Sequence, residues 1–101
     1  MNLQRLAQGD LHEVVASGRI DGEGATQLEG ALGEAMAEGA KRIHVDLSGA
    51  TFISSPGLRA LLQAWRNMQS KGGILHVVDP SVEASTLLNT SGFQKMVLQK
   101  A

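Results

Sequence analysis

Ser55 is the side chain in this sequence best placed for regulated chemistry, because it follows a buried apolar segment and stands where a helix should begin. Pro56 suits the first position of a helix, where a missing N–H costs nothing. The sequence therefore predicts Ser55 as the helix N-cap, accepting hydrogen bonds from the backbone N–H groups of Gly57 or Leu58. The same donors and the positive end of the helix dipole would stabilise a phosphate on that oxygen.

Other polar residues close to Ser55 leave alternatives open. Ser54 is the second choice for a modified serine, and a capping serine needs no further role. Asp46, at the end of the preceding strand, can approach the Ser55 loop or form a turn with Ser48. Asp21 can cap the first helix or line a docking surface, and capping is the expectation.

Enzyme and metal signatures are weak in this sequence. His12, His44 and His76 fall in predicted strands and lack metal-ligand spacing, so we expect sheet histidines, with His44 and His76 adjacent if their strands pair. The Gly-x-Ser-x-Gly pattern of a serine hydrolase is absent. The glycine pairs at 22–24 and 72–73 lack nucleotide-loop spacing. We therefore expect no catalytic residue, metal or cofactor.

Composition predicts one domain spanning 1–101. The 101 residues, 43% of them hydrophobic, suffice for one core. A net charge of -1 without charge runs gives no reason to expect nucleic acid or an anionic membrane as a partner. The chain has no cysteine, and no segment reaches the ~20 apolar residues of a membrane helix. These features indicate a cytoplasmic protein without direct membrane contact.

Apolar spacing predicts strands alternating with helices after an initial hairpin. Strands at 2–8 and 11–16 flank a Gly-Asp turn, and a break at 18–22 precedes a helix that Gly39 ends. A strand ending near Leu47 leads to the helix 56–70. The segment 74–78 is expected to be a strand covered on both faces. A third helix should use Val82, Leu87 and Leu88 as contacts, and 96–98 is the candidate for a last short strand.

This order predicts an α/β fold, with a mixed, mostly parallel sheet of four to five strands and helices packed on it. In the helix 56–70, an apolar stripe should face the core, whereas Arg59, Gln63 and Arg66 should face outward. A protein partner is expected at that outward face and the Ser55 loop. The candidate partner-binding residues are Asp21, Asp46, Ser54, Ser55, Pro56, Gly57, Arg59, Gln63 and Arg66.

Four segments together resemble the STAS-domain antagonists of anti-sigma factors: 18–21 (GRID), 46–48 (DLS), 52–58 (FISSPGL) and 87–93 (LLNTSGF). In that family the phosphoacceptor is the serine two residues before the Gly-Leu pair, which corresponds to Ser55. The resemblance thus implies a STAS-like fold and phosphorylation at Ser55. Ser54 stands where the family often has Asp, and Pro56 where it usually has a small or hydroxylic residue.

The resemblance also implies a partner-switching role. The unphosphorylated protein would bind an anti-sigma serine kinase, a histidine-kinase-like ATPase, which then inactivates it by phosphorylating Ser55; a serine phosphatase is a further partner. One alternative is a STAS subunit of an ABC-type lipid or anion transport assembly that docks on the ATPase without being phosphorylated. Another is a small-ligand or nucleotide-binding module.

Overall fold

A β-hairpin opens the chain, as the Gly-Asp pair predicts. The computed structural model describes residues 1–98; in it, β1 (Asn2–Gln8) pairs antiparallel with β2 (Leu11–Ile20). The turn uses Gly9 at a φ of 60°. The prediction that this strand ends at residue 16 is wrong. Gly18, at a φ of 84°, lies at a shift in pairing register, so it forms an irregularity inside a longer strand.

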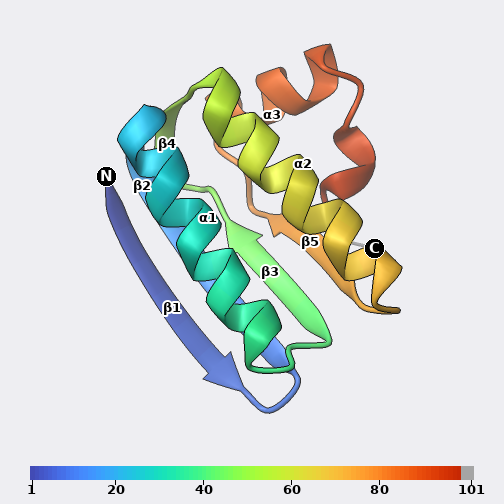
Figure 1. Ribbon diagram of the computed structural model, residues 1–101. Helices are drawn as coiled ribbons and strands as arrows, with labels where there is room; N and C mark the ends of the chain where they lie inside the picture. The colour runs from blue at the N-terminus through green and yellow to red at the C-terminus, as the bar shows by residue number, and fades with distance from the viewer. Residues whose placement is uncertain (99–101) are drawn as a thin grey trace.

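The sheet is mixed and five-stranded, as predicted. It adds β3 (Arg42–Asp46), β4 (Ala50–Ile53) and β5 (Ile74–Val78) in the order β1-β2-β3-β5, and β4 pairs with the end of β2 (Figure 1). Every pairing except the hairpin is parallel. The apolar segment before Ser55 is thus two strands. A tight turn, in which the Ala50 N–H donates to the Leu47 carbonyl, separates them.

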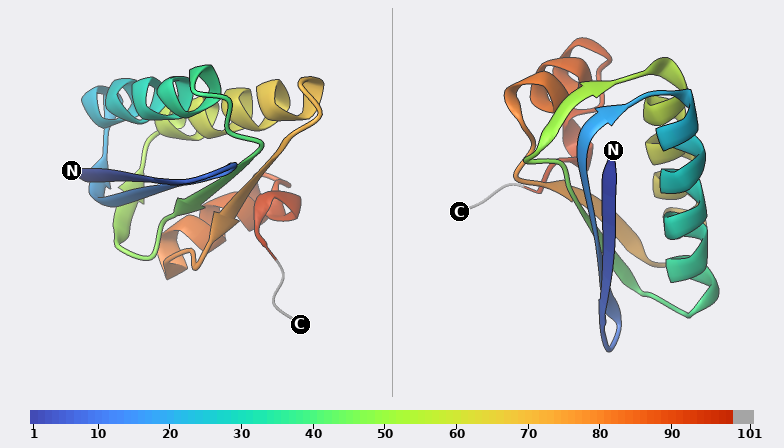
Figure 2. Two further views of the ribbon diagram at one scale, coloured as in Figure 1. Left: turned by 90° about the horizontal axis from the view of Figure 1, so that it is seen from below. Right: turned by 90° about the vertical axis from the view of Figure 1, so that its left-hand side faces the viewer.

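Helices cover the two faces of the sheet unequally. Two long helices, α1 (Gly22–Ala37) and α2 (Ser55–Ser70), lie on one face. On the other face, α3 (Val82–Thr90) lies near the carboxyl ends of the parallel strands, as Figure 2 shows. Among the described residues, no helix is long and apolar enough to cross a membrane.

The end of the described chain differs from prediction. The expected strand at 96–98 is replaced by a short 3-10 helix, η1 (Gln94–Met96), and a single bridge between Val77 and Val97. The Leu98 N–H then donates to the Val77 carbonyl, so residues 97 and 98 do run along β5. Met96 is fully buried, which explains its apolar character without a strand.

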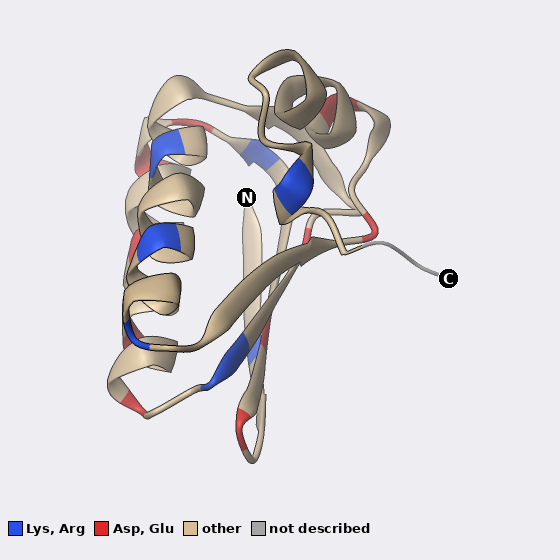
Figure 3. Cartoon of the chain, turned by 90° about the vertical axis from the view of Figure 1, so that its right-hand side faces the viewer, with Lys and Arg blue, Asp and Glu red and all other residues tan. Residues whose placement is uncertain are grey.

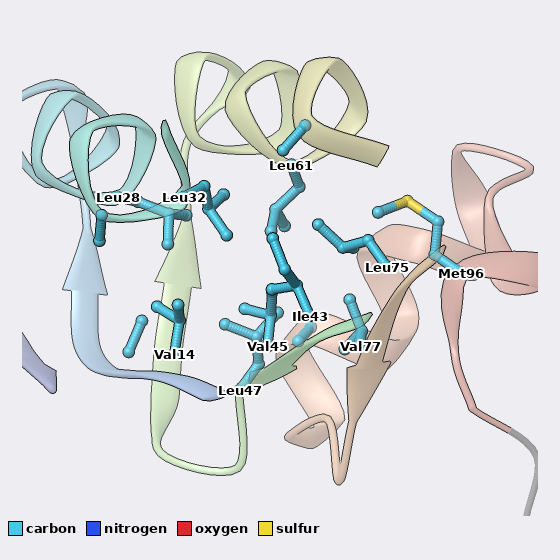
Figure 4. Packing of buried hydrophobic residues seen from close by; sticks show 14 of the residues in the cluster. Val14, Leu28, Leu32, Ile43, Val45, Leu47, Leu61, Leu75, Val77 and Met96 are labelled. Atoms are coloured by element: carbon cyan, nitrogen blue, oxygen red, sulfur yellow. The ribbon is translucent and has the colours of Figure 1, made fainter. Parts of the chain in front are cut away.

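The core lies mainly between the sheet and the α1–α2 layer (Figure 4). Fully buried aliphatic side chains project from both layers: Val14, Leu28, Leu32, Ile43, Val45, Leu61, Leu75 and Val77. Two predictions of burial are wrong. Val82, the first residue of α3, is 80% exposed. Ile74 is 40% exposed because α3 covers only one end of the second face.

Two glycines provide a test of this packing. Gly30 lies within α1 with open space around it, so Gly30→Ala should raise the free energy of unfolding by roughly 0.5–1 kcal/mol. A Cβ on Gly73 would lie 2.8 Å from the Lys41 carbonyl oxygen, so Gly73→Ala should lower it by roughly 1–3 kcal/mol. Denaturant melts measure both. Equal stability of the two variants would contradict the close approach of Gly73 to the start of β3.

Candidate functional site

Ser54, and not Ser55, caps α2. The backbone of Ser54 is extended, with φ -74° and ψ 168°, and its Oγ accepts a hydrogen bond from the Gly57 N–H at 3.2 Å. Its carbonyl accepts from the Leu58 N–H at 2.9 Å. The donors predicted to serve Ser55 are therefore both taken by Ser54. The cap lies one residue earlier because proline is tolerated throughout the first helical turn, so Pro56 does not fix the first position.

Ser55 is the first residue of α2, and it is exposed, whereas Ser54 is half-buried. A modifying enzyme can therefore reach the Ser55 hydroxyl, while the Ser54 hydroxyl already caps the helix. The positive end of the helix dipole still acts on any charge at Ser55. The Gly57 and Leu58 N–H groups, which were predicted to bond the Ser55 oxygen, donate to Ser54 instead.

Close packing holds this serine pair in place. The Ser54 N–H donates to the Ile20 carbonyl at 2.9 Å, which continues the pairing of β4 with β2. Gly57 is buried, and a Cβ there would lie 3.1 Å from methyl groups of both Ile20 and Ile53. The start of α2 is thus seated directly on two paired strands. The backbone that carries Ser55 is therefore fixed by packing against β2 and β4.

Asp21 lies at the neighbouring helix start. Ile20 and Ile53 are register partners, so the residues after them place the first turns of α1 and α2 at the same edge of the sheet (Figure 1). Asp21 caps α1, as expected, by accepting from the Gly24 N–H at 2.9 Å. That hydrogen bond lowers the pKa of Asp21, keeping a negative charge close to the serine pair.

Asp46 forms the turn, the other of its two predicted roles. Its Oδ1 accepts from the Ser48 N–H at 2.9 Å, in the segment between β3 and β4. The carboxylate therefore stabilises the connection between β3 and β4, and β4 leads directly to Ser54 and Ser55.

Arg19 and Phe52 form a contact that the sequence analysis missed. The two residues are register partners in β2 and β4, and the Arg19 guanidinium lies 4.1 Å from the centre of the Phe52 ring. Both side chains are exposed. Arg19 lies two residues before the cap Asp21, and Phe52 lies two residues before the cap Ser54. Only the pairing of two strands far apart in sequence brings them together, so the local pattern carried no signal.

The outward face of α2 has the predicted composition. Arg59, Gln63 and Arg66 are exposed, and Figure 3 shows the two arginines along this helix. Of the predicted core stripe, Leu61 and Met68 are buried, while Leu58, Leu62 and Trp65 are half-buried against the core.

A groove of about 250 Å³ lies between α1 and α2, and the sequence analysis missed it. Its walls include Glu29, Met36, Gln63 and Asn67, and small residues such as Ala60 form part of the lining. All charged side chains of α1 are acidic and all those of α2 are basic. The helix layer therefore has one negative and one positive side.

The histidines lie in strands, as predicted. His44 and His76 are register partners with ring centroids 6.4 Å apart, and His12 is buried with its ring beside Arg5. Burial, with a smaller effect of His44, lowers the pKa of His76. Residues 1–98 contain no cluster of three potential metal ligands.

Two solved structures share this fold over almost the whole chain, and a further relative is similar in sequence over the same extent. An anti-sigma-B factor antagonist of Staphylococcus epidermidis is 22% identical, covering 96% of this chain and 90% of the relative. The anti-sigma factor antagonist SpoIIAA in its unphosphorylated form has a TM-score of 0.85 at 18% identity, covering 99% of this chain and 89% of that one. An anti-sigma factor antagonist from Mycobacterium paratuberculosis has a TM-score of 0.82 at 25% identity, covering 95% and 81%.

The family assignment follows from a match along the chain, including the strands and helices that carry the serine pair. A family model described as "Mlab, STAS domain" matches residues 4–99. The chain therefore belongs to the STAS-domain family.

Proposed function

We propose that this protein is an anti-sigma factor antagonist that acts by partner switching. In its unphosphorylated form it binds an anti-sigma serine kinase in the cytoplasm, and phosphorylation at Ser55 inactivates it. The observation that carries the proposal is an exposed serine on the first turn of α2, in a fold shared with proteins named anti-sigma factor antagonists. The protein acts by binding and is not itself an enzyme.

The choice of Ser55 over Ser54 rests on their surroundings. Phosphorylating Ser54 would modify a half-buried oxygen that caps α2, at a cost to the helix. Phosphorylating Ser55 adds charge at an exposed position and leaves that cap intact. SpoIIAA in its phosphorylated form also matches this fold, with a TM-score of 0.80. A switch that keeps the fold is therefore compatible with this architecture.

The switch itself is electrostatic. A phosphoserine carries about -1.5 to -2 charges, so an interface formed around a neutral hydroxyl would suffer repulsion and a desolvation penalty. We assign the interface to the start of α2, its outward face with Arg59, Gln63 and Arg66, and the adjacent start of α1 at Asp21. Pro56 and Gly57 contribute by fixing the backbone that presents Ser55.

The alternative role in a membrane transport assembly predicts a different chemical state. A subunit docked permanently on a transport ATPase would keep Ser55 unmodified. Intact mass of the protein from its native cell distinguishes the two, and co-purification identifies the ATPase as a serine kinase or a transport subunit. A serine phosphatase completes the cycle in the proposed role.

The first functional prediction concerns the modified residue. Incubation with the partner kinase and ATP should add a single phosphoryl group, and fragment mass mapping should locate it on Ser55 because this hydroxyl is exposed. Phosphate on Ser54, Thr51 or Ser91, with Ser55 unmodified, would contradict the assignment.

The second prediction concerns the outward face of α2. Arg59→Glu or Arg66→Glu should weaken kinase binding in a titration, because each reverses a charge at the proposed interface. Stability should change by only about ±0.5 kcal/mol, since both side chains are exposed. Wild-type affinity in both variants would exclude this face from the interface.

The third prediction separates capping from switching. Ser54→Ala should lower the free energy of unfolding by roughly 0.5–2 kcal/mol, whereas Ser54→Asn should retain the cap. Ser55→Ala should fold with little loss, within about ±0.5 kcal/mol, and should resist inactivation by the kinase. Denaturant melts and a phosphorylation assay on the three variants measure these effects. A larger loss from Ser55→Ala than from Ser54→Ala would reverse the two roles.

Ser55→Asp tests the charge mechanism directly. A carboxylate at the helix start should stabilise the domain by about 0.3–1 kcal/mol, yet weaken kinase binding as the phosphate does. If Ser55→Asp binds as tightly as wild type, charge at this position is not the switch.

A further inference from the structure

Half of one sheet face has no helix over it within residues 1–98. The helices α1 and α2 cover the opposite face, and α3 covers only the carboxyl end of this one (Figure 2). Side chains alternate across a sheet, so the residues that point away from α1 and α2 can be identified from the register. We call the uncovered amino-terminal part the open half-face; its main side chains are Leu6, Leu11, Arg42, His44, Ile74 and His76.

Apolar side chains are exposed on this surface and on α3. Leu6 is 56% exposed and Ile74 is 40% exposed, both on the open half-face. Val82, at the start of α3, is 80% exposed and is followed by the exposed Glu83. Aromatic and aliphatic contacts usually form the centre of an interface, surrounded by polar groups. The two surfaces therefore have matching apolar parts.

The positions of these surfaces are related by a simple rotation. Pairing in register aligns Glu13, His44 and His76 in a row across the sheet. Arg42 lies two residues before that row, and α3 starts beyond the end of β5 on the other side of it. Consider a twofold axis that runs along this row, perpendicular to the strands, and relates two copies of the chain. The rotation would place the carboxyl-terminal half of one copy's sheet face over the amino-terminal half of the other's. It brings α3 of a second copy over the open half-face.

Charges match in the same arrangement. Glu83 is the acidic residue in the first turn of α3, and Arg42 lies at the amino end of β3, where the rotation brings Glu83 of the second copy. Val82 of that copy approaches the same end, near Ile74, which is the register partner of Arg42. Glu13, the acidic group on this side of β2, lies in the row of the axis, one row beyond Arg42.

We propose that the open half-face binds α3 of a second copy of this chain, forming a symmetric dimer. Each copy contributes one α3 and one open half-face, so the same contact forms twice. The assembly is therefore a closed dimer that cannot add further copies through this surface. The dimer lies on the side of the sheet opposite α1 and α2, and it leaves Ser55 and the outward face of α2 accessible. The proposal therefore does not depend on the proposed function, and either can fail alone.

Sedimentation equilibrium of the full chain over a concentration series tests this proposal. The wild-type protein should form dimers, and Val82→Asp, Glu83→Arg or Arg42→Glu should each raise the dimer dissociation constant about tenfold or more. The double variant Glu83→Arg with Arg42→Glu should restore association toward the wild-type value, because the pair is re-formed with reversed charges.

The matched control is Glu29→Arg, the same change of charge on α1, on the opposite side of the sheet. It should leave the dimer intact. Thermal melts confirm that each variant is folded before its association is compared. A monomeric wild type at all concentrations, wild-type dimers in the three single variants, or dissociation by Glu29→Arg would each overturn the proposal.

Discussion

The pairing of β4 with the end of β2 is the constraint on which the candidate site depends. It makes Ile20 and Ile53 register partners, and the chain then leaves both strands at the same edge. The first turns of α1 and α2 must therefore start side by side, with Asp21 and Ser54 as their caps. The absence of a Cβ on Gly57 lets α2 approach these strands closely. Without this pairing, Ser55 would belong to an unsupported loop.

In the proposed function, the adjacent Ser54 and Ser55 meet two different requirements. A helix cap is best kept in a fixed hydrogen bond, and a modification site is best kept exposed with its oxygen available. Ser54 satisfies the first by bonding the Gly57 N–H, and Ser55 satisfies the second as the exposed first residue of α2. Stability and regulation can then change independently. A single serine in both roles would lose helix stability whenever its modification disturbed the cap.

The sequence predicted the features that depend on regular spacing or on local hydrogen bonds. The hairpin, the core side of α2 and the cap at Asp21 follow from such patterns. His44 and His76 were expected to be adjacent only if their strands pair, and that pairing joins segments far apart in the sequence. It did not predict β4, because four residues in which only the first and last are buried show no alternation. Gly18 suggested the end of a strand, although β2 continues past it to Ile20. Pro56 suggested that the helix begins at residue 56, so the cap was predicted one residue too late. The exposure of Ile74 depends on which part of the sheet α3 covers.

The charges of α1 and α2 explain why phosphorylation at Ser55 would weaken, rather than strengthen, partner binding in the proposed switch. The charged side chains of α2 are Arg59 and Arg66, whereas those of α1 are glutamates, so α2 favours an acidic partner surface. A phosphate of about -1.5 to -2 charges at Ser55 would nearly cancel two arginines. The partner would then meet a neutral helix beside an acidic one, and repulsion from α1 would no longer be offset. The same charge stabilises the first turn of α2, so phosphorylation can release a partner without loosening the fold.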